Sequence, residues 1–188
     1  MKKLFIVACF ITTLSATAQN DPRFTIGSKF SYGHSYIMPY GGGFSGSWAV
    51  GLNMTYMSGE HLGFGGDILY SAEGGRIELI DGTGANANIE YMRVPLRVIY
   101  ALGTGAGNFR PRIAAGPTFG VNLREGTGYR DMDFGFNASA GFSYKMLEGL
   151  WLGIDAAYYH GLIDIYDDVP VNERNGNIRL DVSITFGL

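Results

Sequence analysis

The sequence predicts an all-β protein that folds as one eight-stranded, antiparallel, up-and-down transmembrane β-barrel. Three observations support this fold class. Apolar and polar residues alternate with a period of two over eight segments, and the connections between the segments alternate in length. The composition is rich in glycine and aromatic residues but poor in charge, with 29 Gly and only 16% charged residues in 188. Globular domains average about 7% Gly and about 25% charged residues.

The N-terminal residues predict an export signal. Two lysines precede an apolar stretch at 4–14, and the small residues at 16–18 form a cleavage site. The stretch is too short for a membrane-spanning helix, which needs about 20 residues. We therefore predict a cleavable signal peptide over residues 1–18 and a barrel domain over residues 19–188. Cys9, the single cysteine, would leave with the signal peptide, so no disulfide is expected.

The first four strands are predicted from strict alternation. Phe24, Ile26, Phe30 and Tyr32, for example, share one face of the first strand, and small or polar residues occupy the other face. The four predicted strands cover residues 24–32, 48–56, 62–71 and 91–102.

The second half of the chain repeats this pattern. The remaining predicted strands cover residues 109–122, 132–145, 150–159 and 178–188. Pro95 and Pro117 fall inside the fourth and fifth predicted strands. Because proline cannot donate a ladder hydrogen bond, we expect a β-bulge at each.

The connections divide into two sets. Short links at 58–61, 103–108 and 147–149 alternate with longer ones at 34–46, 74–88, 124–131 and 163–176. Transmembrane barrels of outer membranes combine tight periplasmic turns with longer extracellular loops. The asymmetry therefore predicts an integral protein of the cell outer membrane with both termini in the periplasm.

A soluble carrier barrel of the lipocalin type is the alternative fold interpretation. The polar face argues against it, because it is mostly Gly, Ala, Ser and Thr, whereas a soluble surface carries roughly 25–35% charged residues. Small polar residues suit the narrow lumen of an eight-stranded barrel. Aromatic residues also gather at both ends of the apolar face, as lipid-interface girdles do. Those at the short-link end are Phe24, Tyr56, Phe64, Tyr100, Phe109, Tyr144 and Phe186, and those at the long-loop end are Tyr32, Trp48, Tyr70, Phe119, Phe134 and Tyr158.

Several segments resemble the PorT-type outer-membrane β-barrel family of Gram-negative bacteria. They are GGDILYSAEGG at 65–75, YMRVPLRVIYAL at 91–102, RIAAGPTFGVNL at 112–123, AAYYHGLIDI at 156–165 and RLDVSITFGL at 179–188. Their order and spacing cover nearly all of residues 19–188. The last segment resembles the apolar-aromatic final strand that the barrel-insertion machinery recognises. The resemblance implies a location and a fold, and no defined activity.

Charged residues on the predicted lumen face have two interpretations, a selective ion pathway or a filled lumen of paired charges. We favour the filled lumen, because an eight-stranded barrel leaves no open channel and buried charges must pair. Symmetric pairing of the third and fourth strands places Asp67 opposite Pro95 and diagonal to Arg93 and Arg97, so we expect Asp67 between two guanidinium groups. The predicted lumen charges are Lys29, Arg93, Arg97, Arg110, Arg112, Lys145 and Arg179, and Asp67, Glu73, Asp133, Asp155 and Asp181.

No catalytic, metal or cofactor site is predicted. An acyl hydrolase or acyltransferase needs a nucleophile and a histidine base in contact. His34 and Ser35 lie in the first long loop, His61 lies in a short link at the opposite end, and His160 lies on the lipid-facing side of its strand, so no such pair is expected. Asp164, Asp167, Asp168 and Glu173 lack the spacing and central glycine of a calcium loop. The glycines at 41–43 and 103–105 open no helix and are interpreted as turns, not phosphate cradles.

The sequence therefore predicts a structural or interaction protein of the outer membrane that is not an enzyme. The alternatives are a small porin-like channel and a lipid-modifying enzyme. Expected partners are outer-membrane lipid, the barrel-insertion machinery and envelope or extracellular partners of unknown identity. The formal net charge of −3 and the absence of a basic cluster in the sequence exclude nucleic acid as a partner. We expect a monomer.

Overall fold

A computed structural model describes residues 23–38, 43–78, 84–102, 107–124, 128–166 and 173–188. The predicted signal peptide, 1–18, lies outside the described residues. No helix among the described residues is long and apolar enough to cross a membrane.

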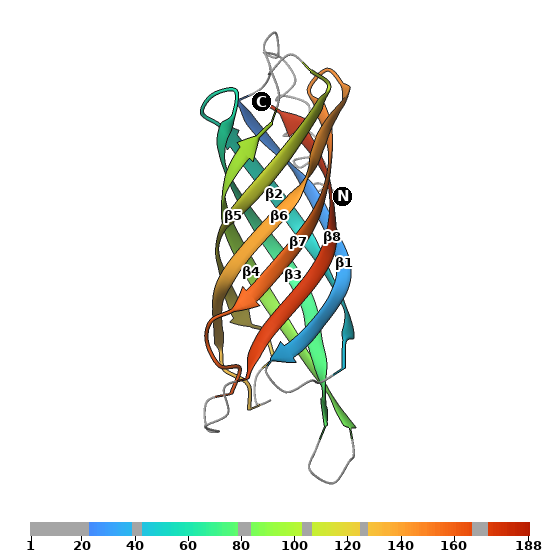
Figure 1. Ribbon diagram of the computed structural model, residues 1–188, viewed down its shortest axis with the longest axis vertical. Helices are drawn as coiled ribbons and strands as arrows, with labels where there is room; N and C mark the ends of the chain where they lie inside the picture. Colours follow the sequence, from blue (N-terminus) through green and yellow to red (C-terminus); the bar gives the residue numbers. More distant parts are fainter. Residues whose placement is uncertain (1–22, 39–42, 79–83, 103–106, 125–127, 167–172) are drawn as a thin grey trace, which may run out of the picture.

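Eight antiparallel strands close into one barrel, in which each strand pairs with its neighbours in sequence and β8 pairs with β1 (Figure 1). This confirms the predicted fold class. The strands are β1 (Phe24–Met38), β2 (Ser45–Met57), β3 (Leu62–Glu78), β4 (Gly84–Ala101), β5 (Phe109–Asn122), β6 (Met132–Leu147), β7 (Leu150–Gly161) and β8 (Arg174–Gly187). Because the strand number is even, β1 starts and β8 ends at the same end of the barrel, here called the termini end; the opposite end is the loop end.

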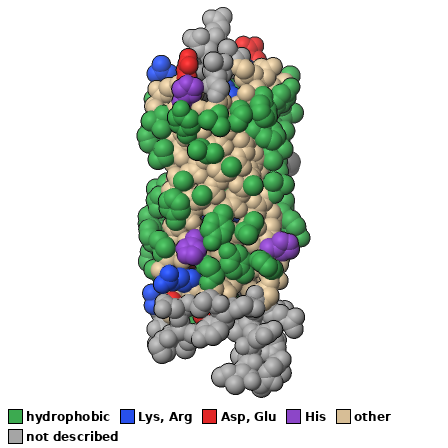
Figure 2. All heavy atoms as spheres, in the orientation of Figure 1, with side chains coloured by type: hydrophobic (Ala, Val, Ile, Leu, Met, Phe, Trp, Pro, Cys, Tyr) green, Lys and Arg blue, Asp and Glu red, His purple; other side chains and the backbone are tan. Residues whose placement is uncertain are grey.

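The barrel has an apolar outside and a polar inside. Phe30 and Leu180 are 51% and 53% exposed, whereas Lys29 and Asp181, one residue away on the same strands, are 2% and 1% exposed. Figure 2 shows hydrophobic side chains over the visible wall and charged side chains only near its two ends. This distribution is suited to a lipid environment, because hydrocarbon accepts the outer side chains and the closed ladder pairs the strand edges.

The strand register places the aromatic residues of the two predicted girdles next to one another. At the loop end the rings of Trp48 and Tyr70 lie 5.4 Å apart between centroids, and those of Phe119 and Phe134 lie 5.1 Å apart. At the termini end Phe24 pairs with Tyr56 across β1 and β2, and Tyr56 pairs with a third aromatic residue, Phe64, on β3. The hydrophobic side chains in Figure 2 form two bands that correspond to these levels.

The strands extend further toward the loop end than the sequence predicts. Strand β1 continues to Met38, β2 begins at Ser45 and β8 begins at Arg174, so about half of the predicted loop 34–46 and the last three residues of the predicted loop 163–176 are strand. The same holds for 74–88, because β3 and β4 have 17 and 18 residues and extend past the rest of the barrel (Figure 1). About 9–11 residues cross a bilayer. Beyond the bilayer, side chains on the outer face need not be apolar. The alternation of apolar and polar residues therefore stops there, although the strands remain hydrogen-bonded to each other.

The expected bulges at Pro95 and Pro117 are a second correction. The register of β3 and β4 is the same on both sides of Pro95, and Pro117 pairs directly with Phe136. Successive residues of an antiparallel strand direct their N–H groups to alternate neighbours, so a proline removes one bond without requiring an extra residue. Beside Pro117, the Asn137 side-chain amide donates a hydrogen bond of 2.8 Å to the carbonyl oxygen of Gly116.

Candidate functional site

The lumen is the candidate site, because it collects the charged side chains of the membrane-spanning region. The predicted lumen charges lie on the inner face, buried or half-buried. The structure divides most of them among three groups at different depths. From the loop end to the termini end these are the Arg93 cluster (Glu73, Arg93, Asp133), the central cluster (Lys29, Asp67, Arg97, Arg179, Asp181) and the Arg112 cluster (Arg112, Ser143, Asp155).

The central cluster is organised around Asp67, which is 1% exposed. Its carboxylate accepts hydrogen bonds from Lys29 Nζ at 2.7 Å, from Arg97 Nη2 at 2.5 Å and from the Asn53 amide at 2.5 Å. Gly66 pairs with Leu96 and Leu69 pairs with Arg93. The same register between these pairs places Asp67 opposite Pro95, as predicted. Asp67 does lie between two cations, but the second cation is Lys29 of β1.

A second carboxylate completes the central cluster. Asp181 of β8 accepts a hydrogen bond of 3.0 Å from Arg179 Nε, and one of its oxygens lies 3.5 Å from Lys29 Nζ. Lys29 therefore bridges two carboxylates from opposite sides of β1. Buried charges require this kind of pairing, because the cost of removing them from water is several kcal/mol per ion.

The prediction that Arg93 contacts Asp67 is wrong. The Arg93 guanidinium instead forms two parallel hydrogen bonds of 2.6 Å with Glu73 and one of 2.9 Å with Asp133. Glu73 lies on the same strand as Asp67 but six residues closer to the loop end. Its carboxylate can engage Arg93 through two bonds at once, the geometry that arginine favours.

Two tyrosine rings enclose the Arg93 guanidinium. Its central carbon lies 4.2 Å from the ring centroid of Tyr91 and 4.3 Å from that of Tyr159. Both rings face the lumen and are almost fully buried. The stacking and the two carboxylates leave Arg93 only 1% exposed.

An apolar cap closes the loop end above the Arg93 cluster. It consists of Ile37, Ile89, Tyr91 and Ile165, with Tyr129 and Tyr166 packed against it. Ile165 follows β7, and its backbone N–H donates to the carbonyl of Glu173 at 2.8 Å. A chain segment outside the strands therefore contributes a side chain that covers the lumen.

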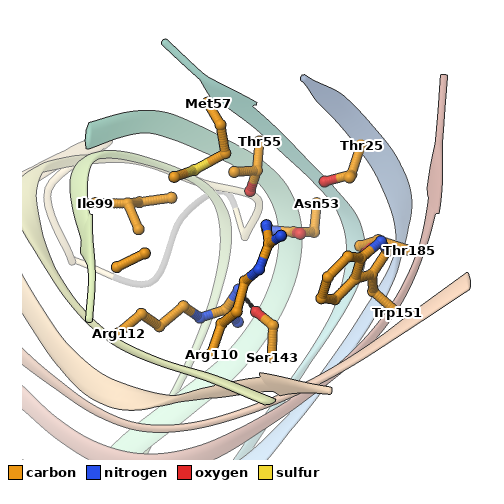
Figure 3. Close-up of a pocket in the computed structure, with 11 residues that line it drawn as sticks. Thr25, Asn53, Thr55, Met57, Ile99, Arg110, Arg112, Ser143, Trp151 and Thr185 are labelled. Carbon is orange, nitrogen blue, oxygen red and sulfur yellow. Dashed lines mark hydrogen bonds between the residues drawn. The ribbon is translucent and has the colours of Figure 1, made fainter. Parts of the chain in front are cut away.

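The Arg112 cluster lies nearest the termini end. Arg112 forms hydrogen bonds of 2.9 and 2.6 Å with the two carboxylate oxygens of Asp155 and one of 2.6 Å with Ser143. Beside it is a cavity of about 60 Å³ into which Arg110 and Arg112 extend from β5 (Figure 3). The cavity lining also includes Trp151.

The histidines predicted to be unsuited to catalysis lie apart. His34 is exposed near Phe44, whereas the Ser35 hydroxyl is buried and accepts a hydrogen bond of 2.8 Å from the Gly74 N–H. His160 contacts the Tyr158 hydroxyl on the outer face at 3.1 Å. His61 lies at the termini end, where a ring nitrogen is 3.1 Å from the Ala101 carbonyl.

Two of the four acidic residues considered for calcium binding are described. Burial raises the pKa of the Glu173 carboxyl, and the negative charge of Asp164 raises it further. Asp167 and Asp168 lie outside the described residues, as do Gly41, Gly42 and the glycines at 103 and 105. Within the described part of the chain, no three His, Cys, Asp or Glu side chains are arranged to hold a metal ion.

The alternation of side chains already places Tyr91, Tyr159 and Trp151 on the lumen face, and strand parity was the signal. Sequence analysis missed that their rings contact lumen cations. Ile165 carried no such signal, because it lies in a predicted loop and contacts the cap only through the tertiary fold.

The fold and the site together define a small membrane barrel whose lumen is occupied by its own side chains. The family model of the outer membrane protein beta-barrel domain matches residues 4–186. The chain belongs to this family and is an integral outer-membrane barrel protein.

Solved structures give the same fold. The outer membrane protein OprG from Pseudomonas aeruginosa has a TM-score of 0.58 and 17% identity, over 91% of this chain and 98% of that one. Neisserial surface protein A has a TM-score of 0.57 and 16% identity, over 89% of this chain and 100% of that one. At these identities the similarity shows the fold alone. A search of curated proteins found no match to this chain.

Proposed function

We propose that this protein is a structural or interaction barrel of the outer membrane that conducts no solute. It acts as a monomer with both termini in the periplasm and its loop end toward the exterior. The connection lengths along the sequence support this orientation. The outer wall binds lipid, and the loop end presents segments to envelope or extracellular partners.

The observation that carries this proposal is the layered filling of the lumen. The apolar cap, the Arg93 cluster and the central cluster occupy successive levels, and each draws residues from several strands. At the central level Asp67 alone joins β1, β2 and β4 to β3 through Lys29, Asn53 and Arg97. A solute would have to break these buried contacts in turn, and an eight-stranded barrel offers no wider path.

Planar-bilayer recording tests the proposal. Folded wild-type protein should insert and show little or no conductance. A parallel sample should verify folding by heat-modifiable gel migration, because membrane barrels stay folded in detergent until heated. A stable, anion-selective current from folded protein would contradict the filled lumen and support the porin-like channel.

We also propose that the barrel has no catalytic activity on lipid. The observation behind this is that the Ser35 hydroxyl and the His34 ring lie on opposite sides of the β1 backbone. His34→Ala and Ser35→Ala should leave the acylation pattern of lipid A unchanged in mass spectra. Loss of a modified lipid species in either variant would favour the lipid-modifying enzyme.

Within its family we propose the PorT type, on the five sequence segments that resemble it. The segment at 179–188 forms the end of β8, with Leu180, Ile184 and Phe186 exposed on the outer face. This apolar-aromatic strand is the proposed signal for the barrel-insertion machinery. Deleting residues 184–188 should abolish assembly in cells, and normal assembly of the truncated chain would refute the signal.

A further inference from the structure

Four buried side-chain atoms at the level of the Arg93 cluster make no hydrogen bond among the described residues. They are Arg93 Nη1, Asp133 Oδ1, the Tyr159 hydroxyl and Asn175 Oδ1. Each belongs to a residue that is 4% exposed or less. Buried polar atoms are almost always hydrogen-bonded to protein groups or to ordered water. Four exceptions at one level of the lumen therefore point to a missing partner.

The strand register brings the first two of these atoms together. Arg93 of β4 pairs with Gly120 of β5, which in turn pairs with Asp133 of β6. The Arg93 guanidinium passes over Gly120 and donates a hydrogen bond of 2.9 Å to Asp133 Oδ2. A Cβ atom at Gly120 would lie 3.0 Å from Arg93 Nη1 and 3.3 Å from the Asp133 Cβ. Arg93 Nη1 and the Asp133 side chain therefore lie beside the same glycine.

The third atom belongs to Asn175 of β8. The amide nitrogen of this side chain donates hydrogen bonds of 3.3 Å to Asp133 Oδ2 and 3.0 Å to the Tyr91 hydroxyl. Both donors of the amide group are thus used within the cluster. The amide oxygen, which can only accept, has no donor among the described residues.

The fourth atom is the hydroxyl of Tyr159 on β7. Its ring stacks on the Arg93 guanidinium, and a Cβ atom at Gly135 would lie 2.6 Å from Tyr159 Cζ, the carbon that bears the hydroxyl. Gly135 stands two residues after Asp133 on β6, so the two face the same side of the sheet. The hydroxyl end of the ring therefore lies at the level of Asp133 and the other two atoms.

The chemistry of the four atoms selects the partner. Arg93 Nη1 and the Tyr159 hydroxyl can donate hydrogen bonds, whereas the oxygens of Asp133 and Asn175 can only accept them. An anion would leave the two accepting oxygens without a donor. A metal ion would leave Arg93 Nη1 without an acceptor. A water molecule both donates and accepts, and buried waters make two to four hydrogen bonds to polar groups of this kind.

We propose that the Arg93 cluster binds an ordered water molecule that hydrogen-bonds these four atoms. The apolar cap on one side and the central cluster on the other separate this water from both ends of the lumen. The water joins β7, whose Tyr159 ring otherwise contacts the cluster by stacking, to β4, β6 and β8 through hydrogen bonds. The site depends neither on the orientation of the barrel nor on the absence of conductance.

NMR spectroscopy of the isotope-labelled wild-type protein in lipid nanodiscs gives a direct test. The guanidinium protons of Arg93 should show a cross-peak to the water resonance. This cross-peak should have opposite signs in NOE and ROE spectra, as a bound water produces, whereas chemical exchange with bulk water gives the same sign in both. The absence of a cross-peak with opposite signs in the folded protein would overturn the proposal, even if no variant folds.

The variant Tyr159→Phe tests the water through the sign of its effect, because it removes the hydroxyl and keeps the ring that stacks on Arg93. Removing a buried hydroxyl that has no partner is neutral or stabilising, whereas removing one that binds water loses a hydrogen bond. Tyr159→Phe should therefore raise the equilibrium constant for unfolding in lipid vesicles by about two- to tenfold. The matched control is Tyr144→Phe on the outer wall, which should change it little. An unchanged or lowered constant in Tyr159→Phe would refute the site.

Salt substitution distinguishes a bound water from a bound ion. Replacing sodium chloride with choline chloride, or with sodium gluconate, at the same ionic strength should leave both the Arg93 cross-peak and the unfolding constant unchanged. A change in either quantity that follows the cation alone or the anion alone would refute the water and assign the site to that ion.

Discussion

Arg97 and Asp67 link β4 to β3 at the level where a proline interrupts the ladder between these strands. Arg97 Nη2 donates a hydrogen bond of 2.5 Å to Asp67 Oδ1, and Pro95 lies opposite Asp67 in the register. Because Pro95 has no N–H to donate, a buried side-chain pair joins the strands where a backbone bond is missing. This relationship makes Asp67 both a component of the sheet and the centre of the lumen cluster.

Removing the Asp67 carboxylate should therefore be severely destabilising. Asp67→Ala leaves Lys29 and Arg97 in the lumen without this partner, and we expect a loss of about 3–5 kcal/mol in the free energy of unfolding, or less if water enters. Urea unfolding in lipid vesicles measures it. Glu90→Ala is the matched control, because Glu90 pairs with an exposed arginine, and exposed ion pairs contribute little to stability. Similar losses in both variants would contradict the buried role of Asp67.

The lipid-facing assignment predicts a dependence on depth. Leu96 is 46% exposed on the outer wall, and Leu96→Arg near the bilayer midplane should cost about 2–4 kcal/mol. Leu62→Arg, at the first position of β3, should cost about 0–1 kcal/mol, because an arginine at the interface reaches water. The same vesicle unfolding assay compares them. Equal costs would mean that Leu96 does not face hydrocarbon.

The proposed orientation can be tested with two cysteines at open glycine positions. A Cβ atom at Gly46 or at Gly59 meets no atom within 4 Å, so both substitutions should be tolerated. Gly46 lies at the loop end, near the start of β2, and Gly59 lies in the turn between β2 and β3. A membrane-impermeant thiol reagent should label Gly46→Cys on intact cells, and should label Gly59→Cys only after the outer membrane is opened. The reverse pattern would invert the topology.

The segment after β7 should lose stability as the pH rises. Burial and the charge of Asp164 hold the pKa of Glu173 above its ordinary value. Protonated Glu173 therefore favours the folded segment below the ordinary pKa of glutamate, and this contribution is lost as the pH rises through the elevated value. The Ile165 N–H, which donates to the Glu173 carbonyl, is the reporter.

Hydrogen exchange of Ile165, corrected for the intrinsic exchange rate at each pH, measures this effect. Protection should fall with rising pH in the wild type and stay level in Glu173→Gln, which carries no charge at either pH. Glu60→Gln, in the turn between β2 and β3, should retain the wild-type dependence. If Glu173→Gln keeps the fall in protection, another group is responsible.

Much of this architecture follows from local chemistry. Alternation of side chains places Phe30 outside and Lys29 inside without any knowledge of their neighbours, because successive side chains of a strand point to opposite faces. The even number of such segments puts both ends of the barrel domain on one side. The position of Asp67 opposite Pro95 was also predictable, because a hairpin pairs residues symmetrically about its turn.

Other features required the closed barrel. Lys29 reaches Asp67 across β2, and Tyr159 of β7 stacks on Arg93 of β4; neither contact joins adjacent strands. The extensions of the strands at the loop end were not predicted, because apolar–polar alternation indicates which residues contact lipid and not which residues form strand hydrogen bonds. Ile165 reaches the cap from a segment that has no strand pattern at all.

The sequence by itself thus determined which side chains face lipid and which face the lumen, since that choice depends on a period of two within each strand. Only the tertiary structure decided which lumen charges pair and where a cavity is left beside Arg112. Those outcomes depend on barrel closure and stagger, which bring strands distant in sequence to the same depth across a narrow interior.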